Sequence, residues 1–369
     1  MHGMHSTAPT LQGTTAAPAL RLVFWESTIS CNLTCSHCRR LTTDAAASKH
    51  DLSTTQAQEL ISDIGRIGPA ILVFSGGEAL MRQDLFTLID HAHACGLTPA
   101  LASNGALIDD AMAARIKDHG VHRVAISLDG ADAQTHDHLR GIPGSFDAAC
   151  AALRRLKALG VSTQINATIS RLNMAQRDAL ADLACTLEAD ALHCFILVPV
   201  GCGGEIDPAI RLNPGETEVF LRWLAQRSIN SPVFIKATCA PQYHRILRQQ
   251  EIPAQHSSGN HHLSRMSRGC LAGRNVCFVS HDGEVFPCGY LPLSAGSIHQ
   301  QSLSEIWSDA LLFQGLRDDD RLQGRCGACD HQDICGGCRA RSWAESENAW
   351  AEDPSCPYHP RAGQSDSCA

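Results

Sequence analysis

The regular alternation of apolar runs with amphipathic segments between residues 21 and 197 constrains the fold of this chain most strongly. The apolar runs are typical of buried strands and occupy residues 21–26, 70–74, 98–102, 123–128, 162–168 and 192–197. Segments of helical periodicity separate them, one starting at a capping-box sequence near Ser53 and the others at residues 85–95, 110–119, 146–159 and 174–187. Six such units predict an α/β fold with parallel strands covered by helices. Because a closed barrel of this kind has eight units, we expect a partial (β/α)6 barrel.

Residues able to bind ligands directly follow four of these strands. Cys31 comes after the first apolar run, Gly76 after the second, Asn104 after the third and Asp129 after the fourth. The carboxyl ends of parallel strands meet at one edge, where α/β barrels build their active sites. The sequence therefore predicts a functional site at that edge.

Three cysteines stand close together after the first strand. Cys31, Cys35 and Cys38 have the spacing CxxxCxxC, without a fourth cysteine nearby. A structural zinc site needs four ligands and closes on itself. A 4Fe–4S cluster has four irons to ligate, so three local cysteines leave one corner open. We expect that corner to bind something other than protein.

The chain has 369 residues and 18 cysteines, and most of the cysteines bunch at residues 31–38 and 270–356. Residues 1–20 lack the basic start and apolar core of a secretory signal. We therefore expect a cytoplasmic location, where clustered cysteines serve as metal or cluster ligands rather than as disulfides.

The net charge of −8, without a run of lysines and arginines, argues against nucleic acid or an anionic membrane as the main partner. No apolar run approaches the ~20 residues of a membrane span.

The pattern changes along the chain and predicts four regions. Residues 1–20 form a tail, residues 21–206 the α/β core, residues 207–265 a connector with two helices, and residues 266–369 a cysteine-rich region. That last region begins with a predicted hairpin at residues 276–280 and 284–287. Its eight clustered cysteines are enough for two clusters of four irons, although CxxC pairs also form structural zinc sites.

The cysteine triad, followed by Gly76-Gly77-Glu78 after the second strand, resembles the radical S-adenosylmethionine (radical SAM) family. The resemblance implies that Cys31, Cys35 and Cys38 ligate three irons and that the methionine part of SAM chelates the fourth. The reduced cluster would cleave SAM to a 5′-deoxyadenosyl radical, a species that no side chain can supply.

The same resemblance implies a SAM pocket. Glycine lets the backbone approach a ligand closely, and the Gly76–Glu78 strip would recognise the methionine ammonium. Arg140 can bind a carboxylate bidentately. The SAM-binding residues implied are His37, Gly76, Gly77, Glu78, Asn104, Ser127, Asp129 and Arg140.

The C-terminal cysteines, with Gly283 five positions before Cys288, resemble the SPASM domain, which carries two auxiliary 4Fe–4S clusters. The resemblance assigns Cys270, Cys277, Cys288 and Cys338 to the first cluster, and Cys326, Cys329, Cys335 and Cys356 to the second. Only two residues separate Cys335 from Cys338, where the family pattern has three.

Stretches such as "FILVPVGCGGEI" resemble the SPASM proteins that act on tetrapyrroles, the haem synthases of the siroheme-dependent pathway and their relatives in haem d1 synthesis. This implies oxidative decarboxylation of two propionates of an iron-porphyrin substrate, iron-coproporphyrin III, to the vinyl groups of haem b. An external one-electron donor of flavodoxin or ferredoxin type would be needed. The four histidines of the outlying segments, His2, His5, His261 and His262, are candidate ligands of the substrate iron.

Two other functions remain open. One is a peptide maturase of the SPASM group, although residues 1–20 are too short for the N-terminal peptide-binding region that such enzymes often carry. The other is a non-catalytic iron–sulfur electron carrier. The Gly76-Gly77-Glu78 strip and the open corner of the triad argue against a carrier, which needs no SAM pocket.

Overall fold

The computed structural model describes residues 17–39, 49–253 and 269–360. Within them one ten-stranded sheet has the order β10-β9-β8-β1-β2-β3-β4-β5-β6-β7. Seven consecutive parallel strands form the barrel wall. They are β1 Leu22–Thr28, β2 Ile71–Gly76, β3 Thr98–Ser103, β4 Arg123–Ser127, β5 Ser162–Ile169, β6 Ala191–Ile196 and β7 Phe234–Thr238.

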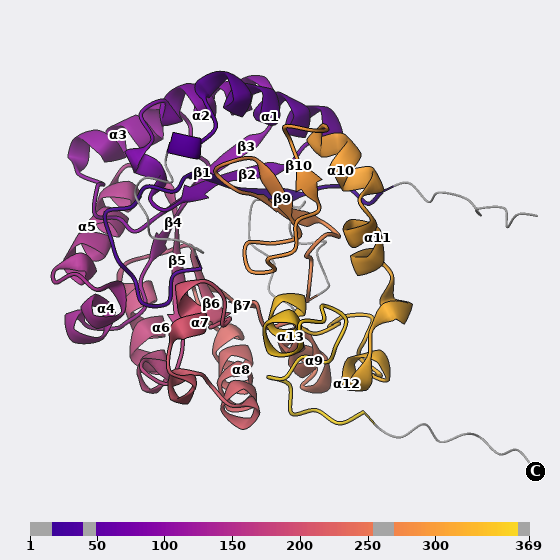
Figure 1. The fold of residues 1–369 in the computed structure, drawn as a ribbon. Coiled ribbons are helices and arrows are strands. Elements are labelled where there is room, and N and C mark those ends of the chain that lie inside the picture. Colours follow the sequence, from indigo (N-terminus) through magenta and orange to yellow (C-terminus); the bar gives the residue numbers. More distant parts are fainter. Residues whose placement is uncertain (1–16, 40–48, 254–268, 361–369) are drawn as a thin grey trace, which may run out of the picture.

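Helices cover the outer face of this wall, and the sheet curves so that its inner face, called the lumen face below, is turned toward the centre of the barrel (Figure 1). The main helices are α1 Thr54–Ile67, α2 Leu85–Ala94, α3 Asp110–Asp118, α4 Ala133–Arg140, α5 Ser145–Ala158, α6 Arg177–Thr186, α8 Pro214–Ser228 and α9 Gln242–Gln249. Shorter turns are η2 Ala79–Met81, η3 Met174–Gln176, α7 Cys202–Glu205 and η4 Pro208–Ile210. The predicted α/β partial barrel is confirmed, and so is the capping box, in which Ser53 and Gln56 cap α1.

The C-terminal region continues the same sheet. Strand β8 (Val276–Val279) pairs in parallel with β1, and β9 (Glu284–Phe286) and β10 (Gly296–Ser297) follow antiparallel. The remaining elements are α10 Leu303–Asp309, α11 Leu311–Arg317, η5 Asp319–Arg321, α12 Gly324–Gly327 and α13 Arg339–Ser346. The predicted hairpin is therefore present, and it extends the barrel sheet.

Strand β7 lies in the segment that the sequence predicted as a helical connector, and that prediction missed it. Ile235 and Ala237 point into the main apolar core, whereas Phe234, Lys236 and Thr238 on the opposite face are less buried. Five residues with a central lysine gave too weak an alternation to be recognised. The predicted boundary near residue 265 and most of the 1–20 tail lie outside the described residues.

Strand alternation separates the two faces of the wall. Along β5 every second residue is fully buried against the helices, while Ser162, Gln164, Asn166 and Thr168 face the lumen. The main core therefore lies between sheet and helices, and polar side chains gather inside the barrel.

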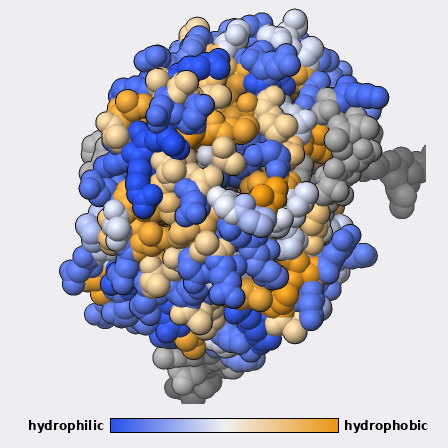
Figure 2. Space-filling view, turned by 90° about the vertical axis from the view of Figure 1, so that its left-hand side faces the viewer, coloured by the Kyte–Doolittle hydropathy of each residue, from blue (hydrophilic) through white to orange (hydrophobic). Residues whose placement is uncertain are grey.

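On the face shown in Figure 2, hydrophobic residues are interspersed with hydrophilic ones. Among the described residues, no helix combines the length and the apolar character needed to cross a membrane.

Candidate functional site

The loop that carries the cysteine triad is held by the end of β2. The backbone N–H groups of Gly77 and Glu78 donate to the carbonyls of Thr28 (2.8 Å) and Ser30 (2.7 Å). A Cβ on Gly76 would stand 2.3 Å from the Thr28 oxygen, and one on Gly77 would stand 2.2 Å from the Ser30 oxygen. Only glycine fits at these two positions, because any side chain would collide with the loop that the β2 end supports. This steric requirement holds independently of any ligand.

The triad thiols have hydrogen-bond donors suited to thiolates. The Leu33 N–H donates to Cys31 Sγ at 3.4 Å, and Arg140 Nη1 donates to Cys35 Sγ at 3.6 Å. Burial raises the pKa of the Cys35 thiol, and the Arg140 guanidinium opposes that rise. No disulfide joins any of the described cysteines. Three thiols on one loop, with N–H donors to sulfur, fit the ligand set of a 4Fe–4S cluster with one open iron.

Asp129 links the triad loop to the end of α4. Its Oδ2 lies 2.6 Å from Arg140 Nη2 and 3.2 Å from His37 Nε2, and its Oδ1 accepts from the Thr168 N–H at 2.7 Å. Burial would raise the pKa of this carboxyl, but Arg140 and His37 hold it well below its usual value. Asp129 is thus an ionised anchor, and Arg140 contacts both it and Cys35.

Glu78 and Asn104 form a second buried link at the same edge. Glu78 Oε2 accepts from the Asn104 N–H at 2.8 Å, and Asn104 Nδ2 donates to Asn32 Oδ1 at 2.8 Å. Burial raises the pKa of Glu78 in spite of these hydrogen bonds. Ser127 ends the neighbouring strand β4, opposite Asn166 of β5. All the predicted SAM-pocket residues therefore lie at one edge of the sheet. Asn32, inside the CxxxCxxC loop, was not predicted.

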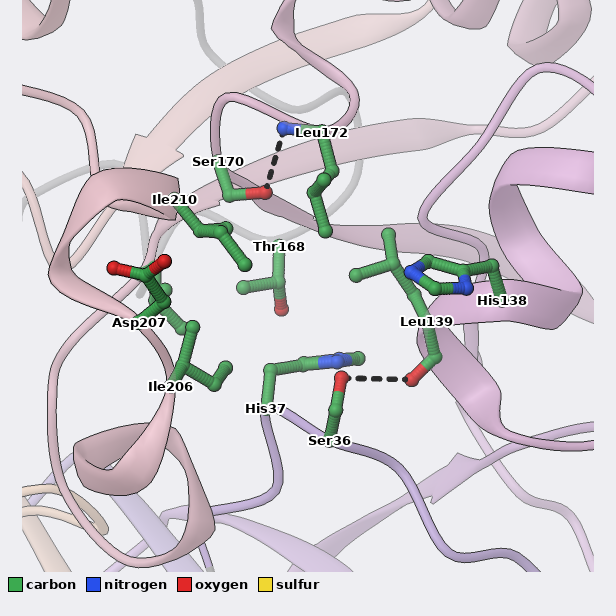
Figure 3. A pocket seen from close by; sticks show the side chains of 11 residues that line it. Ser36, His37, His138, Leu139, Thr168, Ser170, Leu172, Ile206, Asp207 and Ile210 are labelled. Carbon is green, nitrogen blue, oxygen red and sulfur yellow. Dashed lines mark hydrogen bonds between the residues drawn. The ribbon is translucent and has the colours of Figure 1, made fainter.

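A pocket opens beside the triad loop (Figure 3). His37 lies along one side of the pocket, and apolar side chains from α4, from the end of β5 and from the η4 segment line the rest of it. Nδ1 of His37 is buried without a partner among the described residues. The lining residues are Ser36, His37, His138, Leu139, Thr168, Ser170, Leu172, Leu197, Ile206, Asp207 and Ile210. A flat aromatic group with hydrogen-bonding nitrogens suits such a pocket.

Four C-terminal cysteines lie together around α12 and α13. Three of the sulfurs accept from a backbone N–H: Cys326 from Asp353 (3.4 Å), Cys329 from His331 (3.5 Å) and Cys335 from Gly337 (3.5 Å). Burial raises the pKa of Cys335, and the thiols of Cys356 and Cys326 raise it further. The predicted second set, Cys326, Cys329, Cys335 and Cys356, is therefore brought together.

The predicted first set is brought together only in part. Cys288 and Cys338 pack in a second apolar cluster around Leu291. Burial raises the pKa of both thiols, and Cys270 contributes to each rise. Cys277 lies elsewhere, fully buried in the main core within β8. The close spacing of Cys335 and Cys338 is accommodated by two glycines of positive φ, which turn the two thiols toward different sets.

No group of three or more His, Cys, Asp or Glu side chains in the described ranges converges on a point where one metal ion could sit.

A pair of basic side chains faces the lumen below this edge. His193 of β6 and Lys236 of β7 are direct cross-strand partners. Burial lowers the pKa of Lys236, and no carboxylate of the described residues counteracts it. Nε2 of His193 is buried and has no hydrogen-bond partner among the described residues. Burial lowers the pKa of His193, and the positive charges of Lys236 and Arg123 lower it further. The sequence analysis missed this pair. Its candidate haem ligands, His2, His5, His261 and His262, lie outside the described residues.

Comparison with known proteins agrees with this geometry. Residues 25–184 match the family described as the Radical SAM superfamily, and residues 270–330 match SPASM, described as an iron-sulfur cluster-binding domain. The chain belongs to the radical SAM superfamily and carries a SPASM domain, as its sequence predicted. It is an enzyme that uses SAM and 4Fe–4S clusters.

Its similarity to individual proteins extends over nearly the whole chain. The AdoMet-dependent heme synthase of Methanosarcina barkeri is 41% identical over 344 residues, covering 93% of this chain and 97% of that protein. The AdoMet-dependent heme synthase of Oleidesulfovibrio alaskensis is 39% identical over 365 residues, covering 97% and 93%. The solved structure of anSMEcpe with bound AdoMet and Cp18Cys peptide has a TM-score of 0.67 at 18% identity, covering 92% of this chain and 94% of that chain, and thus shares the fold.

Proposed function

We propose that this enzyme decarboxylates two propionates of iron-coproporphyrin III oxidatively, leaving the two vinyl groups of haem b. The observation that carries the proposal is the 41% identity to an AdoMet-dependent heme synthase over 97% of that protein's length. The site supports it, because radical chemistry at an unactivated carbon needs the SAM-binding edge, and a carboxylate-rich substrate needs buried cations.

The triad and the strand ends would hold the cofactors. We assign Cys31, Cys35 and Cys38 to the cluster that binds SAM, and the edge formed by His37, Gly76, Gly77, Glu78, Asn104, Ser127, Asp129 and Arg140 to SAM itself. When bound, these cofactors supply a carbon-centred radical that can take a hydrogen atom from a propionate.

The residues of the chain would hold SAM in one orientation. The Asp129–Arg140–His37 set fixes the triad loop against α4, so that loop and pocket keep their spacing. The apolar pocket beside His37 suits adenine, with the unpartnered Nδ1 available to accept a hydrogen bond from its exocyclic amino group.

The two basic side chains that face the lumen, His193 and Lys236, suit a substrate that carries carboxylates. Iron-coproporphyrin III carries four propionates, and a buried carboxylate must meet a cation or a hydrogen-bond donor. Lys236 and His193 offer both, and Arg123 lies close enough to influence His193.

Each decarboxylation releases carbon dioxide, passes one hydrogen atom to the SAM-derived radical and leaves one electron to be removed. We assign that electron to the auxiliary clusters of the SPASM domain, and the starting electron to an external donor of flavodoxin or ferredoxin type. The reducing cytoplasm, where thiolate ligands persist, is the proposed location.

Anaerobic turnover with SAM, a reductant and iron-coproporphyrin III tests the proposal by mass analysis of the tetrapyrrole. We expect two successive losses, each of one carbon dioxide and two hydrogens, and no loss with Cys35→Ala. An unchanged tetrapyrrole, together with modification of a small peptide under the same conditions, would assign the enzyme to the peptide maturases instead.

A further inference from the structure

We propose that Cys239, and not Cys277, is the fourth protein ligand of the auxiliary cluster that Cys270, Cys288 and Cys338 would share. The proposal rests on the iron–sulfur content of the SPASM domain and is independent of the substrate. Nothing in the spacing of the C-terminal cysteines indicates it, since Cys239 lies 31 residues before Cys270.

Cys277 is on the wrong face of the sheet for this role. It pairs with Val23 of β1, is fully buried, and belongs with Val279 to the main core. Phe278 points to the opposite face, where it contacts Arg39, the residue after Cys38. Because side chains alternate along a strand, Cys277 points away from the face where the triad lies.

The electrostatic surroundings of Cys277 agree with that position. Its thiol has a pKa raised by burial alone, without any contribution from another described thiol. A cluster ligand would have the other ligand thiols as neighbours. Cys277 therefore behaves as a small apolar core residue.

Cys239 lies outside the strand, so the alternation that buries Cys277 does not apply to it. It directly follows β7, at the carboxyl end of the strand. It packs with Cys288 and Cys338 in the second apolar cluster. Gly269 lies against Pro241, so closely that a Cβ there would stand 2.6 Å from the Pro241 Cα. This contact brings Cys270 beside the turn that contains Cys239.

The backbone at Cys239 is held in an uncommon conformation. Its φ is +54°, in the left-handed region that residues other than glycine rarely adopt. Arg341 Nη2 donates to its carbonyl at 3.0 Å, and Nη1 of the same buried guanidinium reaches Ser355 Oγ at 3.2 Å. Such strain persists where the surroundings fix it, commonly at functional sites.

The charges around Cys239 suit a buried cluster. Burial raises the pKa of its thiol, and the thiols of Cys338 and Cys288 raise it further, in agreement with their packing in the same apolar cluster. Arg341 lies among these thiols, and Cys338 and Cys239 both raise the pKa of its guanidinium. One buried cation thus offsets part of the negative charge that four thiolates would bring.

The matched pair Cys239→Ala and Cys277→Ala tests the assignment, because each removes one buried sulfur. Iron per chain after anaerobic reconstitution and the EPR spectrum of the clusters are the readouts. We expect about twelve irons for the wild type and for Cys277→Ala, four per cluster. Cys239→Ala should lose about one to four irons and the EPR signal of one auxiliary cluster, and it should retain SAM binding at the triad cluster.

A second variant guards against misfolding. Cys239→Ser keeps a ligand atom of similar size, and we expect a shifted EPR signal for the affected cluster with a near-normal circular dichroism spectrum. Unchanged iron and EPR in both Cys239 variants would overturn the proposal, as would iron loss in Cys277→Ala. A wild type with about four irons would overturn it by removing the auxiliary clusters. None of these readouts uses a porphyrin, so the proposed function can fail separately.

Discussion

Arg140 is the residue on which the geometry of the SAM-binding edge depends. Its guanidinium contacts the Asp129 carboxylate with one nitrogen and the Cys35 sulfur with another. Burial would lower the pKa of this side chain, but Asp129 and Cys35 raise it above its usual value. The residue is therefore a permanent cation that joins the buried anchor to the cluster loop.

Arg140→Lys should weaken SAM binding while leaving the protein folded. Lysine keeps the charge beside Asp129, but a single ammonium cannot reproduce the planar two-nitrogen contact. Losing one hydrogen bond to a charged group corresponds to about 1.5–3 kcal/mol, or about 10- to 150-fold in the dissociation constant for SAM. Equilibrium binding to reconstituted protein measures it, with Arg66→Lys, a mostly exposed arginine, as the control. Equal affinities of the two variants would contradict the role given to Arg140.

At the scale of elements, the junction between the β2 end and the β1 loop sets the position of the triad. Gly76 and Gly68 both have positive φ, at 152° and 141°. They differ in their surroundings, because a Cβ at Gly76 would meet the Thr28 oxygen and one at Gly68 would meet nothing within 4 Å. The pair separates backbone strain from a steric clash.

Gly76→Ala should destabilise the fold more than Gly68→Ala and should also lower cluster content. Overpacking costs about 1–3 kcal/mol beyond the strain that both variants share. Urea unfolding gives the stability difference, and iron per chain after reconstitution gives the effect on the triad loop. If both variants unfold at the same urea concentration and hold the same iron, the close contact at Gly76 has no structural importance.

The elements and the triad could be predicted from the sequence because their signals are local. Hydrophobic period, the capping box and the CxxxCxxC spacing are all contained within a few residues. Asn32, Lys236 and Cys239 could not be predicted, since their positions depend on which strands pair and which loops meet. Cys277 shows the reverse, because its spacing fits a motif while strand alternation turns it into the core.

At the scale of the whole molecule, two histidines in different regions, His136 and His244, make stability depend on pH. Burial lowers the pKa of His136, beside Asp129, and of His244, in α9 next to Lys236, to about 4 in each case. An unfolded histidine titrates near pH 6.5. Between about pH 6.5 and 4 the unfolded chain therefore binds more protons, and stability falls as the pH is lowered through this window.

The free energy of unfolding should thus be flat above about pH 7 and fall by about 1 kcal/mol per histidine between pH 6.5 and 5.5. Urea midpoints measured anaerobically at these pH values give the slope. His244→Phe, which keeps an aromatic ring beside Tyr243, should make the slope shallower. A slope equal to that of the wild type would show that His244 is not held neutral.

The central claim is that this chain aims a SAM-derived radical at the propionates of an iron porphyrin. Iron-coproporphyrin III labelled with deuterium at the propionate carbons next to the ring tests it most directly. We predict that 5′-deoxyadenosine acquires one deuterium for each carbon dioxide released, and that Cys35→Ala forms neither product. Unlabelled 5′-deoxyadenosine, formed by the wild type without release of carbon dioxide, would contradict the account.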